Sequence, residues 1–228
     1  MVKRLDPRLL LHGYASGVFP MADSRDTDEL FWVEPRKRAI LPLQGFHLSR
    51  SLAKRIRSGR FRVTADQAFE QVLAGCADRE ETWINRPIEQ AMLELHRAGG
   101  AHSVEVWEGE ELVGGLYGAA LGRAFFGESM FSRRTDASKV ALAWLVARLR
   151  AGHFTLLDCQ FMTEHLASLG AVDVPRRTYV TLLSEALAAG DLPPADWGAL
   201  DGLLSSSGAG ADSGAPGKLI TQLLGQTS

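Results

Sequence analysis

The stretch HSVEVWEGEELVGGLYGAALGRAFFGESMF (102–131) is rich in β-branched and aromatic residues. It divides into three segments, which are His102–Glu108, Glu111–Leu121 and Arg123–Phe131. Gly109 and Gly122 stand at the two junctions, where glycine is typical of tight connections between strands. The stretch therefore predicts a three-stranded meander.

A helix and another strand follow the meander. Ala137–Arg150 has the periodicity of an amphipathic helix, and Phe154–Gln160 is an apolar run typical of a buried strand. Upstream, capping residues and periodicity predict helices from Pro7 to Gly17, over Ser49–Ser58, over Gln67–Cys76 and from Arg86 to Ala98. Short extended segments are expected at Leu30–Glu34, Ala39–Leu43 and Arg60–Thr64. This order is typical of an α+β domain of the acetyltransferase (GNAT) type.

Two more helices are expected downstream, over Glu164–Leu169 and from Pro175 toward Ala189. The composition then changes, and Ser205–Gly217 is a low-complexity stretch typical of a flexible linker. Lys218–Leu224 could form a short helix. We expect three parts: a small N-terminal α/β domain (1–36), a GNAT-like catalytic domain (37–190) and a low-complexity C-terminal tail (191–228).

Composition indicates a cytoplasmic protein. The only cysteines, Cys76 and Cys159, lie in no CxxC pair and no metal-ligand cluster, so we expect neither a disulfide framework nor a metal site. No apolar run approaches the roughly 18–20 residues that span a bilayer. The first residues lack the apolar stretch of a secretory signal.

Positive charge is concentrated between Arg36 and Ala65. This window has no acidic residue and nine basic ones, although the whole chain has 25 basic and 27 acidic residues. Such a block is the electrostatic footprint of a protein that binds a phosphate backbone. An arginine-rich solvated surface would explain it equally well, and the acid-free length favours the polyanion. The window contains Arg36, Lys37, Arg38, Arg50, Lys54, Arg55, Arg57, Arg60 and Arg62.

Two polar groups interrupt otherwise apolar strands. Alternation places Asp158 and Gln160 on one face at the end of their strand, where a carboxylate and an amide could orient an amine. Asp158 could instead cap the next helix. Glu128 follows Ala124-Phe125-Phe126-Gly127, and a buried charge there requires a partner. An exposed glutamate at a strand edge is the alternative.

Glycines and a tryptophan mark two further positions. Gly114, Gly115 and Gly118 lie in one predicted strand, which indicates strand curvature or the close approach of another backbone or a ligand. Trp83 lies in a loop before a helix. A tryptophan there could stack on a nucleic-acid base or cover the edge of a core.

Ordered motifs along roughly Leu5–Leu187 resemble one family. The chain is similar to leucyl/phenylalanyl-tRNA–protein transferases. Each motif is too short to indicate a family by itself, and the resemblance rests on their occurrence in this order. The motifs are Gly17-Val18-Phe19-Pro20, Trp32 with Pro35-Arg36, Phe46-His47 with Ser49-Arg50-Ser51, Thr82-Trp83-Ile84, His102 to Trp107, Glu111 to Gly118, Gly127 to Ser132, Leu157-Asp158-Cys159-Gln160, Ser168-Leu169-Gly170 and Val174 to Arg177.

The resemblance implies transfer of Leu or Phe, and less readily Met, from aminoacyl-tRNA to proteins that begin with Arg or Lys. The modified N-terminus would be read as a degradation signal. The resemblance implies no metal, no organic cofactor and no membrane, and a monomer is the family-based default.

The resemblance also implies roles for individual positions. Glu128, Asp158 and Gln160 correspond to the catalytic positions near the reacting amine, and Trp83 corresponds to a residue near the terminal adenosine. The basic residues Lys54, Arg55, Arg57 and Arg60 would hold the acceptor stem. The aminoacyl pocket would be lined by Leu116, Phe125, Gly127, Met130 and Leu157.

The chemical hypothesis is aminolysis of an activated ester. Such an ester needs no enzymatic nucleophile, only an amine held close to its carbonyl. We expect Asp158, oriented by Gln160, to accept the proton of the amine, with assistance from the ribose hydroxyl as the alternative.

Two rival functions are an acetyl-CoA-dependent N-acetyltransferase and a non-catalytic tRNA-binding module. Asp136 stands where a phosphate-binding loop for CoA would have its first glycine, which argues against the first rival. The basic block by itself is compatible with the second.

Overall fold

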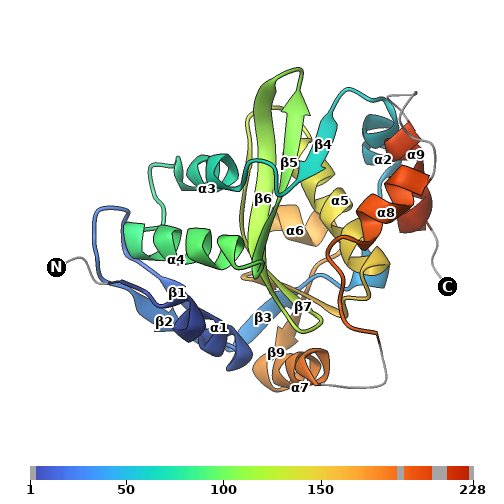
Figure 1. Ribbon diagram of the computed structural model, residues 1–228. Helices are drawn as coiled ribbons and strands as arrows, with labels where there is room; N and C mark the ends of the chain where they lie inside the picture. Colours follow the sequence, from blue (N-terminus) through green and yellow to red (C-terminus); the bar gives the residue numbers. More distant parts are fainter. Residues whose placement is uncertain (1–3, 189–192, 207–214, 226–228) are drawn as a thin grey trace.

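A seven-stranded sheet forms the centre of the computed structural model, which describes residues 4–188, 193–206 and 215–225 (Figure 1). The strand order is β4-β5-β6-β7-β8-β3-β9. All neighbours are antiparallel except β7 and β8, which are parallel. The strands are β3 (Lys37–Ile40), β4 (Arg62–Ala65), β5 (Ala101–Glu108), β6 (Glu111–Leu121), β7 (Ala124–Ser132), β8 (Leu156–Gln160) and β9 (Val172–Pro175).

The predicted meander is confirmed as β5–β6–β7. The predicted helix and strand that follow it are α5 (Ala137–Ala151) and β8. Parallel strands need a crossover connection, and α5 supplies it between β7 and β8. Its prediction as an amphipathic helix is wrong, because α5 is buried on nearly every side between the sheet and other helices.

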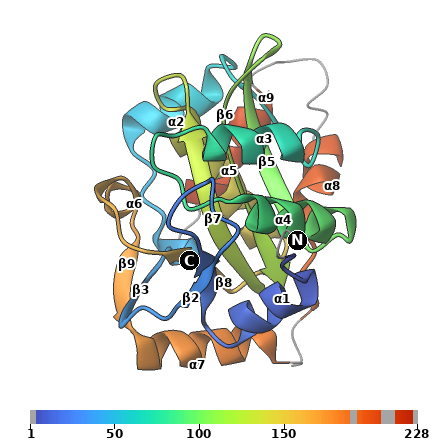
Figure 2. The ribbon, with the colours of Figure 1, turned by 90° about the vertical axis from the view of Figure 1, so that its left-hand side faces the viewer.

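Helices cover both faces of the sheet, and each face has its own apolar core (Figures 1 and 2). One face is covered by α1 (Pro7–Ala15), α3 (Phe69–Ala77), α4 (Arg86–Arg97) and α7 (Arg176–Leu187). The other is covered by α2 (Arg50–Arg57), α5, α6 (Glu164–Ser168), α8 (Ala199–Ser206) and α9 (Ala215–Gly225). The chain is therefore an α+β protein with three layers.

The predicted helix starts are confirmed by side-chain caps. The side chains of Asp6, Ser49 and Asn85 accept hydrogen bonds from backbone N–H groups of the first turns of α1, α2 and α4. Strand prediction was less accurate. β9 was missed, and the segment expected to remain extended to Leu43 turns into a short 3₁₀ helix, η1 (Leu43–Gly45).

The N-terminal segment contributes a small sheet and part of a core. β1 (Phe19–Met21) and β2 (Phe31–Val33) pair as a two-stranded antiparallel sheet beside α1. Tyr14 of α1 is fully buried in the same apolar cluster as α3 and α4. The N-terminal segment therefore shares a core with the rest of the chain.

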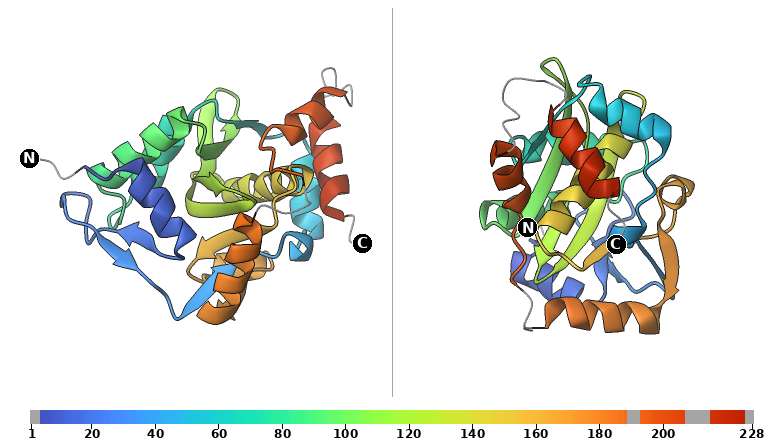
Figure 3. Two further views of the ribbon diagram at one scale, coloured as in Figure 1. Left: turned by 60° about the horizontal axis from the view of Figure 1, so that its bottom comes forward. Right: turned by 90° about the vertical axis from the view of Figure 1, so that its right-hand side faces the viewer.

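The C-terminal segment is more structured than its composition indicates. The expected low-complexity tail holds two helices, α8 and α9, which pack against α5 and α2 (Figure 3). Leu200 and Ile220 are completely buried there. Apolar residues at helical spacing outweigh the small polar residues around them. Part of the stretch predicted as a linker, residues 207–214, lies outside the described residues.

Two arginines of α5, the buried Arg148 and the partly buried Arg150, reinforce this packing. Arg150 donates hydrogen bonds of 2.8 Å to the carbonyl oxygens of Leu43 and of Leu223, near the end of α9. Arg148 pairs with Asp201 of α8 at 2.6 Å. Carbonyl oxygens near the end of a helix attract cations, so these contacts stabilise the docked helices. Over the part of the chain that the structure describes, no helix is long and apolar enough to cross a membrane.

We expect Gly217→Ala to destabilise the fold by about 1–3 kcal/mol. A Cβ atom at Gly217 would collide with the carbonyl oxygen of Ile56, a backbone atom of α2 that has no rotamer in which to move away. Urea denaturation measures the loss. Gly202→Ala in α8 is the matched control, because nothing lies within 4 Å of its added methyl group. It should raise helix stability by about 0.5–1 kcal/mol. Equal effects of the two substitutions would contradict the close approach of α9 to α2.

Candidate active site

A cavity of about 420 Å³ lies where β7 and β8 stop pairing. The two strands pair only from Ala124 to Phe126 on β7 and from Leu156 to Asp158 on β8. Residues beyond this point on both strands line the cavity. Leucines from four neighbouring elements give it apolar walls, namely Leu116 of β6, Leu142 and Leu145 of α5, Leu157 of β8 and Leu166 of α6.

Most of the predicted site residues meet at this cavity. Glu128, Gln160 and Trp83 line it, together with the predicted pocket residues Leu116, Gly127, Met130 and Leu157. Phe125 does not line it. This side chain is fully buried and stacks on Trp197, with the ring centroids 5.4 Å apart. Phe125 belongs to the apolar core on the α5 face of the sheet, and Trp197 packs against this core. A register shift between β6 and β7 separates Phe125 from Met130, so the two side chains do not follow one alternation.

Glu128 is the acidic group at the polar end of the cavity. Its Oε1 atom accepts hydrogen bonds of 2.8 Å from the Tyr14 hydroxyl and from the Gln160 side-chain amide. Burial raises the pKa of Glu128 to about 8, and the nearby charge of Asp158 adds to this rise. The hydrogen bonds from Tyr14 and Gln160 and the charge of Arg38 act in the opposite direction. A carboxyl group so placed ionises readily once a cation approaches it.

Unpartnered polar atoms gather at the same cavity. Four buried side-chain polar atoms among the described residues make no hydrogen bond, and three of them belong to residues that line it. They are the Tyr117 hydroxyl, Glu128 Oε2 and His165 Nε2. Buried polar groups in native proteins are normally paired, and exceptions cluster where a ligand binds. The cavity therefore has the polar atoms of a binding site as well as apolar walls.

Asp158 lies outside the cavity, in a buried ion pair with Arg38. The guanidinium group of Arg38 donates to both carboxylate oxygens, at 2.8 and 2.6 Å, and the Tyr179 hydroxyl donates to Oδ2 at 2.8 Å. The backbone N–H of Gln160 adds a fourth bond, 2.8 Å to Oδ1. Arg38 also lies over the rings of Phe19 and Tyr179. All the strong acceptor positions of Asp158 are therefore occupied.

The predicted pairing of Asp158 with the Gln160 side chain is wrong. The Gln160 amide donates to Glu128, and only the backbone of Gln160 contacts Asp158. The reason is the backbone of Gln160, whose φ of +61° breaks the alternation of β8 at its last residue. Such a left-handed conformation costs a non-glycine residue about 1–3 kcal/mol, and it is found preferentially at functional sites.

The basic block divides into paired and unpaired charges. Arg38 is only 1% exposed, so its inclusion in a polyanion-binding surface is wrong. Arg55 pairs with Asp136 at 3.4 Å, and Arg60 pairs with Glu108 at 2.6 Å. Lys54 and Arg57 are exposed on α2, and no ion pair among the described residues includes them. Arg50, at the start of α2, is likewise exposed and outside these ion pairs, so the exposed positive charge of α2 comes from three residues.

Comparison with known proteins places this geometry in a family. A family model described as leucyl/phenylalanyl-tRNA protein transferase matches residues 40–184, which is more than half of the chain. The chain belongs to the leucyl/phenylalanyl-tRNA–protein transferase family. A second model, described as the N-terminal domain of this transferase, matches residues 3–36.

Individual relatives support the family assignment over the full length. The leucyl/phenylalanyl-tRNA–protein transferase of Rhizorhabdus wittichii is 58% identical and covers 100% of both chains. That of Phenylobacterium zucineum is 56% identical and covers 98% of each. Among solved structures, L-PGS from Bacillus licheniformis matches with a TM-score of 0.40 at 13% identity, covering 72% of this chain and 56% of that one. This last likeness is too distant to carry an argument.

Several residues that line this cavity or contact its polar groups were not predicted from the sequence. Tyr14 and Tyr117 have the positions of ordinary core residues in their helix and strand, and Arg38 lies within a run of charges. The one sequence signal that this arginine faces inward is the apolar run Ala39-Ile40-Leu41, which follows it directly. His165 and Cys159 gave no periodic signal. Their roles depend on tertiary contacts between elements far apart in the chain.

Proposed function

We propose that this chain transfers Leu or Phe, and less readily Met, from aminoacyl-tRNA to the α-amino group of proteins that begin with Arg or Lys. The new N-terminal residue would serve as a degradation signal. The reaction would take place in a GNAT-like catalytic domain spanning 37–190, behind a small N-terminal domain spanning 1–36. The observation that carries the proposal is an apolar cavity with a buried carboxyl group, one of whose oxygens is unpartnered.

The apolar part of the cavity suits the side chain of the donor amino acid. Its walls are mainly leucine and methionine side chains, which adapt to a branched chain such as Leu or to a flat ring such as Phe. Trp83 lines the same cavity and offers a surface for the terminal adenosine to stack on. This arrangement would place the ester carbonyl near Glu128 and Gln160.

The polar end of the cavity suits a cationic acceptor. An N-terminal Arg or Lys carries two positive groups, and either one favours the ionised form of Glu128. In the reaction, the neutral amine nitrogen forms a bond to the ester carbonyl carbon, and the bond from that carbon to the ribose oxygen breaks. Glu128 would accept the proton that the amine loses, and the ribose oxygen leaves as a hydroxyl group after it gains a proton.

Asp158 fits a supporting role better than that of proton acceptor. Four hydrogen bonds already occupy its oxygens, whereas Glu128 Oε2 makes none. We infer that Asp158 fixes the backbone of Gln160, and that Gln160 in turn fixes Glu128. Arg38 and Tyr179 would hold Asp158 in place. In this proposal Glu128 accepts the proton, and Asp158 and Gln160 position it.

The test is the mass of a peptide that begins with Arg after incubation with the protein and one donor. We expect a gain of one Phe or Leu residue from Phe-tRNA or Leu-tRNA, since the cavity matches these side chains. The same peptide with an acetylated N-terminus is the control and should gain nothing. An acetyl-sized gain from acetyl-CoA would overturn the proposal in favour of an acetyltransferase. Salt-sensitive tRNA binding without any transfer would favour a binding module.

A further inference from the structure

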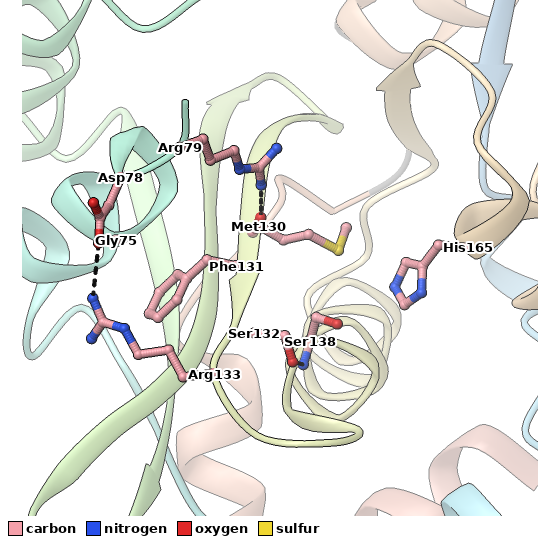
Figure 4. A pocket seen from close by; sticks show the side chains of 9 residues that line it. All are labelled: Gly75, Asp78, Arg79, Met130, Phe131, Ser132, Arg133, Ser138 and His165. Atoms are coloured by element: carbon pink, nitrogen blue, oxygen red, sulfur yellow. Dashed lines mark hydrogen bonds and ion pairs between the residues drawn. The ribbon is translucent and has the colours of Figure 1, made fainter. Parts of the chain in front are cut away.

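A second cavity, of about 440 Å³, adjoins the first (Figure 4). The two cavities share Arg79, Met130 and His165 as lining residues. We call the second cavity the arginine pocket. It is lined by Gly75, Asp78, Arg79, Met130, Phe131, Ser132, Arg133, Ser138 and His165. The two cavities are therefore immediate neighbours.

Positive charge dominates the arginine pocket. In Figure 4, Arg79 and Arg133 lie above and below the Phe131 ring, and His165 faces Met130 across the pocket. Arg79 donates a hydrogen bond to the Met130 carbonyl oxygen. The guanidinium group of Arg133 lies 5.2 Å from the centre of the Phe131 ring. Arg133 also donates a hydrogen bond of 3.3 Å to the Leu112 carbonyl oxygen. These contacts hold both guanidinium groups in place, and each group has further N–H donors.

One acidic residue opposes this charge. Asp78 lies 3.8 Å from Arg133, and its side chain is 80% exposed. An exposed pair at that distance contributes little to stability, so an incoming anion can compete for Arg133. The His165 ring supplies an additional polar atom, because its Nε2 is buried and has no partner. Burial and the nearby charge of Lys139 lower the pKa of His165, which shows that Lys139 adds to the positive field.

The start of α5 lies at the arginine pocket and also contacts the basic helix α2. Ser138, at the start of α5, lines the pocket. Asp136, the N-cap residue of α5, precedes it by two positions. Asp136 in turn contacts Arg55 of α2. The start of α5 is therefore in contact with α2, although the residue that makes the contact is acidic.

We propose that the arginine pocket binds the phosphodiester backbone at the 3′ end of the donor RNA. This inference rests on the proposed function, because the aminoacyl ester in the first cavity is attached to the terminal ribose. The next phosphates of the strand must lie within one or two nucleotides of that ribose. Guanidinium groups suit them, since their planar set of N–H donors pairs with two phosphate oxygens at once.

The experiment compares one donor that has no phosphate with one that has the phosphodiesters nearest the ester. The first is phenylalanyl-adenosine, and the second is the phenylalanylated trinucleotide CCA, which adds two cytidines and the phosphodiesters that join them to the adenosine. For Arg133→Ala we expect the KM of the trinucleotide to rise about 10-fold, the effect of one lost charge-assisted hydrogen bond. The KM of phenylalanyl-adenosine should stay unchanged. Arg97→Ala on α4 is the control, because this exposed arginine lies in neither cavity, and both KM values should stay unchanged.

Binding provides a readout that does not depend on transfer. Calorimetry with a CCA trinucleotide that carries no amino acid should show about 10-fold weaker binding to Arg133→Ala than to the wild type. Equal losses for both donors, or unchanged binding of the trinucleotide, would overturn the inference while leaving the transferase proposal intact. Absence of transfer from either donor to an Arg peptide by the wild type would instead overturn the proposed function, and with it this inference.

Discussion

Glu128→Gln is expected to slow transfer to an Arg peptide by about 10²–10⁴-fold, the usual contribution of a positioned proton acceptor. Glutamine has the same shape, and its side-chain oxygen can still accept the hydrogen bonds from Tyr14 and Gln160. The amide group would then occupy the position of Glu128 Oε2, which is buried and has no hydrogen-bond partner. The substitution thus removes the proton acceptor and the negative charge with little change in packing.

The dependence on pH identifies the group responsible. With a pKa of about 8, Glu128 gains its charge as the pH rises through that value. The ratio of the wild-type rate to the Glu128→Gln rate should therefore increase with pH up to about 8. Titration of the acceptor amine cancels in this ratio, because the two enzymes use the same peptide. A ratio near one at every pH would eliminate Glu128 as the proton acceptor.

The stability of the fold gives an independent check. Ionisation of Glu128 should lower the stability, whereas it should increase the rate of transfer. The pKa of Glu128 lies above its ordinary value of 4.5, so the folded protein binds this proton more tightly than the unfolded chain does. The stabilisation is complete below about pH 4.5 and is lost as the pH rises toward 8. The free energy of unfolding of the wild type should therefore fall relative to that of Glu128→Gln across this window. Urea denaturation at several pH values measures the difference.

Local signals in the sequence predicted much of the fold. Caps such as Asp6 and Asn85 act within one turn of a helix, and the alternation of the meander acts within one strand. These signals located the helix starts and the central strands to within a few residues. They also placed Glu128 in the third strand of the meander and Gln160 at the end of the strand that follows α5. Residues whose environment is set by their own element were therefore predictable.

Long-range contacts were not predictable in the same way. Whether Gln160 contacts Asp158 or Glu128 depends on its left-handed backbone, and no pattern of residues indicates that conformation. Arg38 looked like part of a basic surface because its 120-residue separation from Asp158 hides the pairing. Phe125 was expected in the pocket, whereas its stacking partner Trp197 lies in a segment whose composition gave no sign of packing.

Arg38→Ala is expected to destabilise the fold by about 3–5 kcal/mol. It would leave the carboxylate of Asp158, which is fully buried, without its counter-ion. Arg4→Ala is the matched control. Arg4 makes an ion pair of almost the same length with Glu94, 2.7 Å against 2.6 Å, but its side chain is 70% exposed. Solvent screens such a pair, so its loss should be a small fraction of the loss at Arg38. Equal losses in urea denaturation would contradict the burial of the Arg38–Asp158 pair.

The same ion pair decides between two roles for Asp158. If Asp158 were the proton acceptor, Arg38→Met would leave that acceptor in place, and the pH at which transfer reaches its maximum would move with the changed charge around it. If Asp158 positions Gln160 and Glu128, the folded fraction of Arg38→Met should show a lower kcat, a nearly unchanged KM for the peptide and a pH profile that still follows Glu128. The positioning role requires the second result, because Asp158 reaches the cavity only through the Gln160 backbone and the amide that Gln160 donates to Glu128. In that case the rate falls because the Gln160 amide is held less firmly against the Glu128 carboxylate.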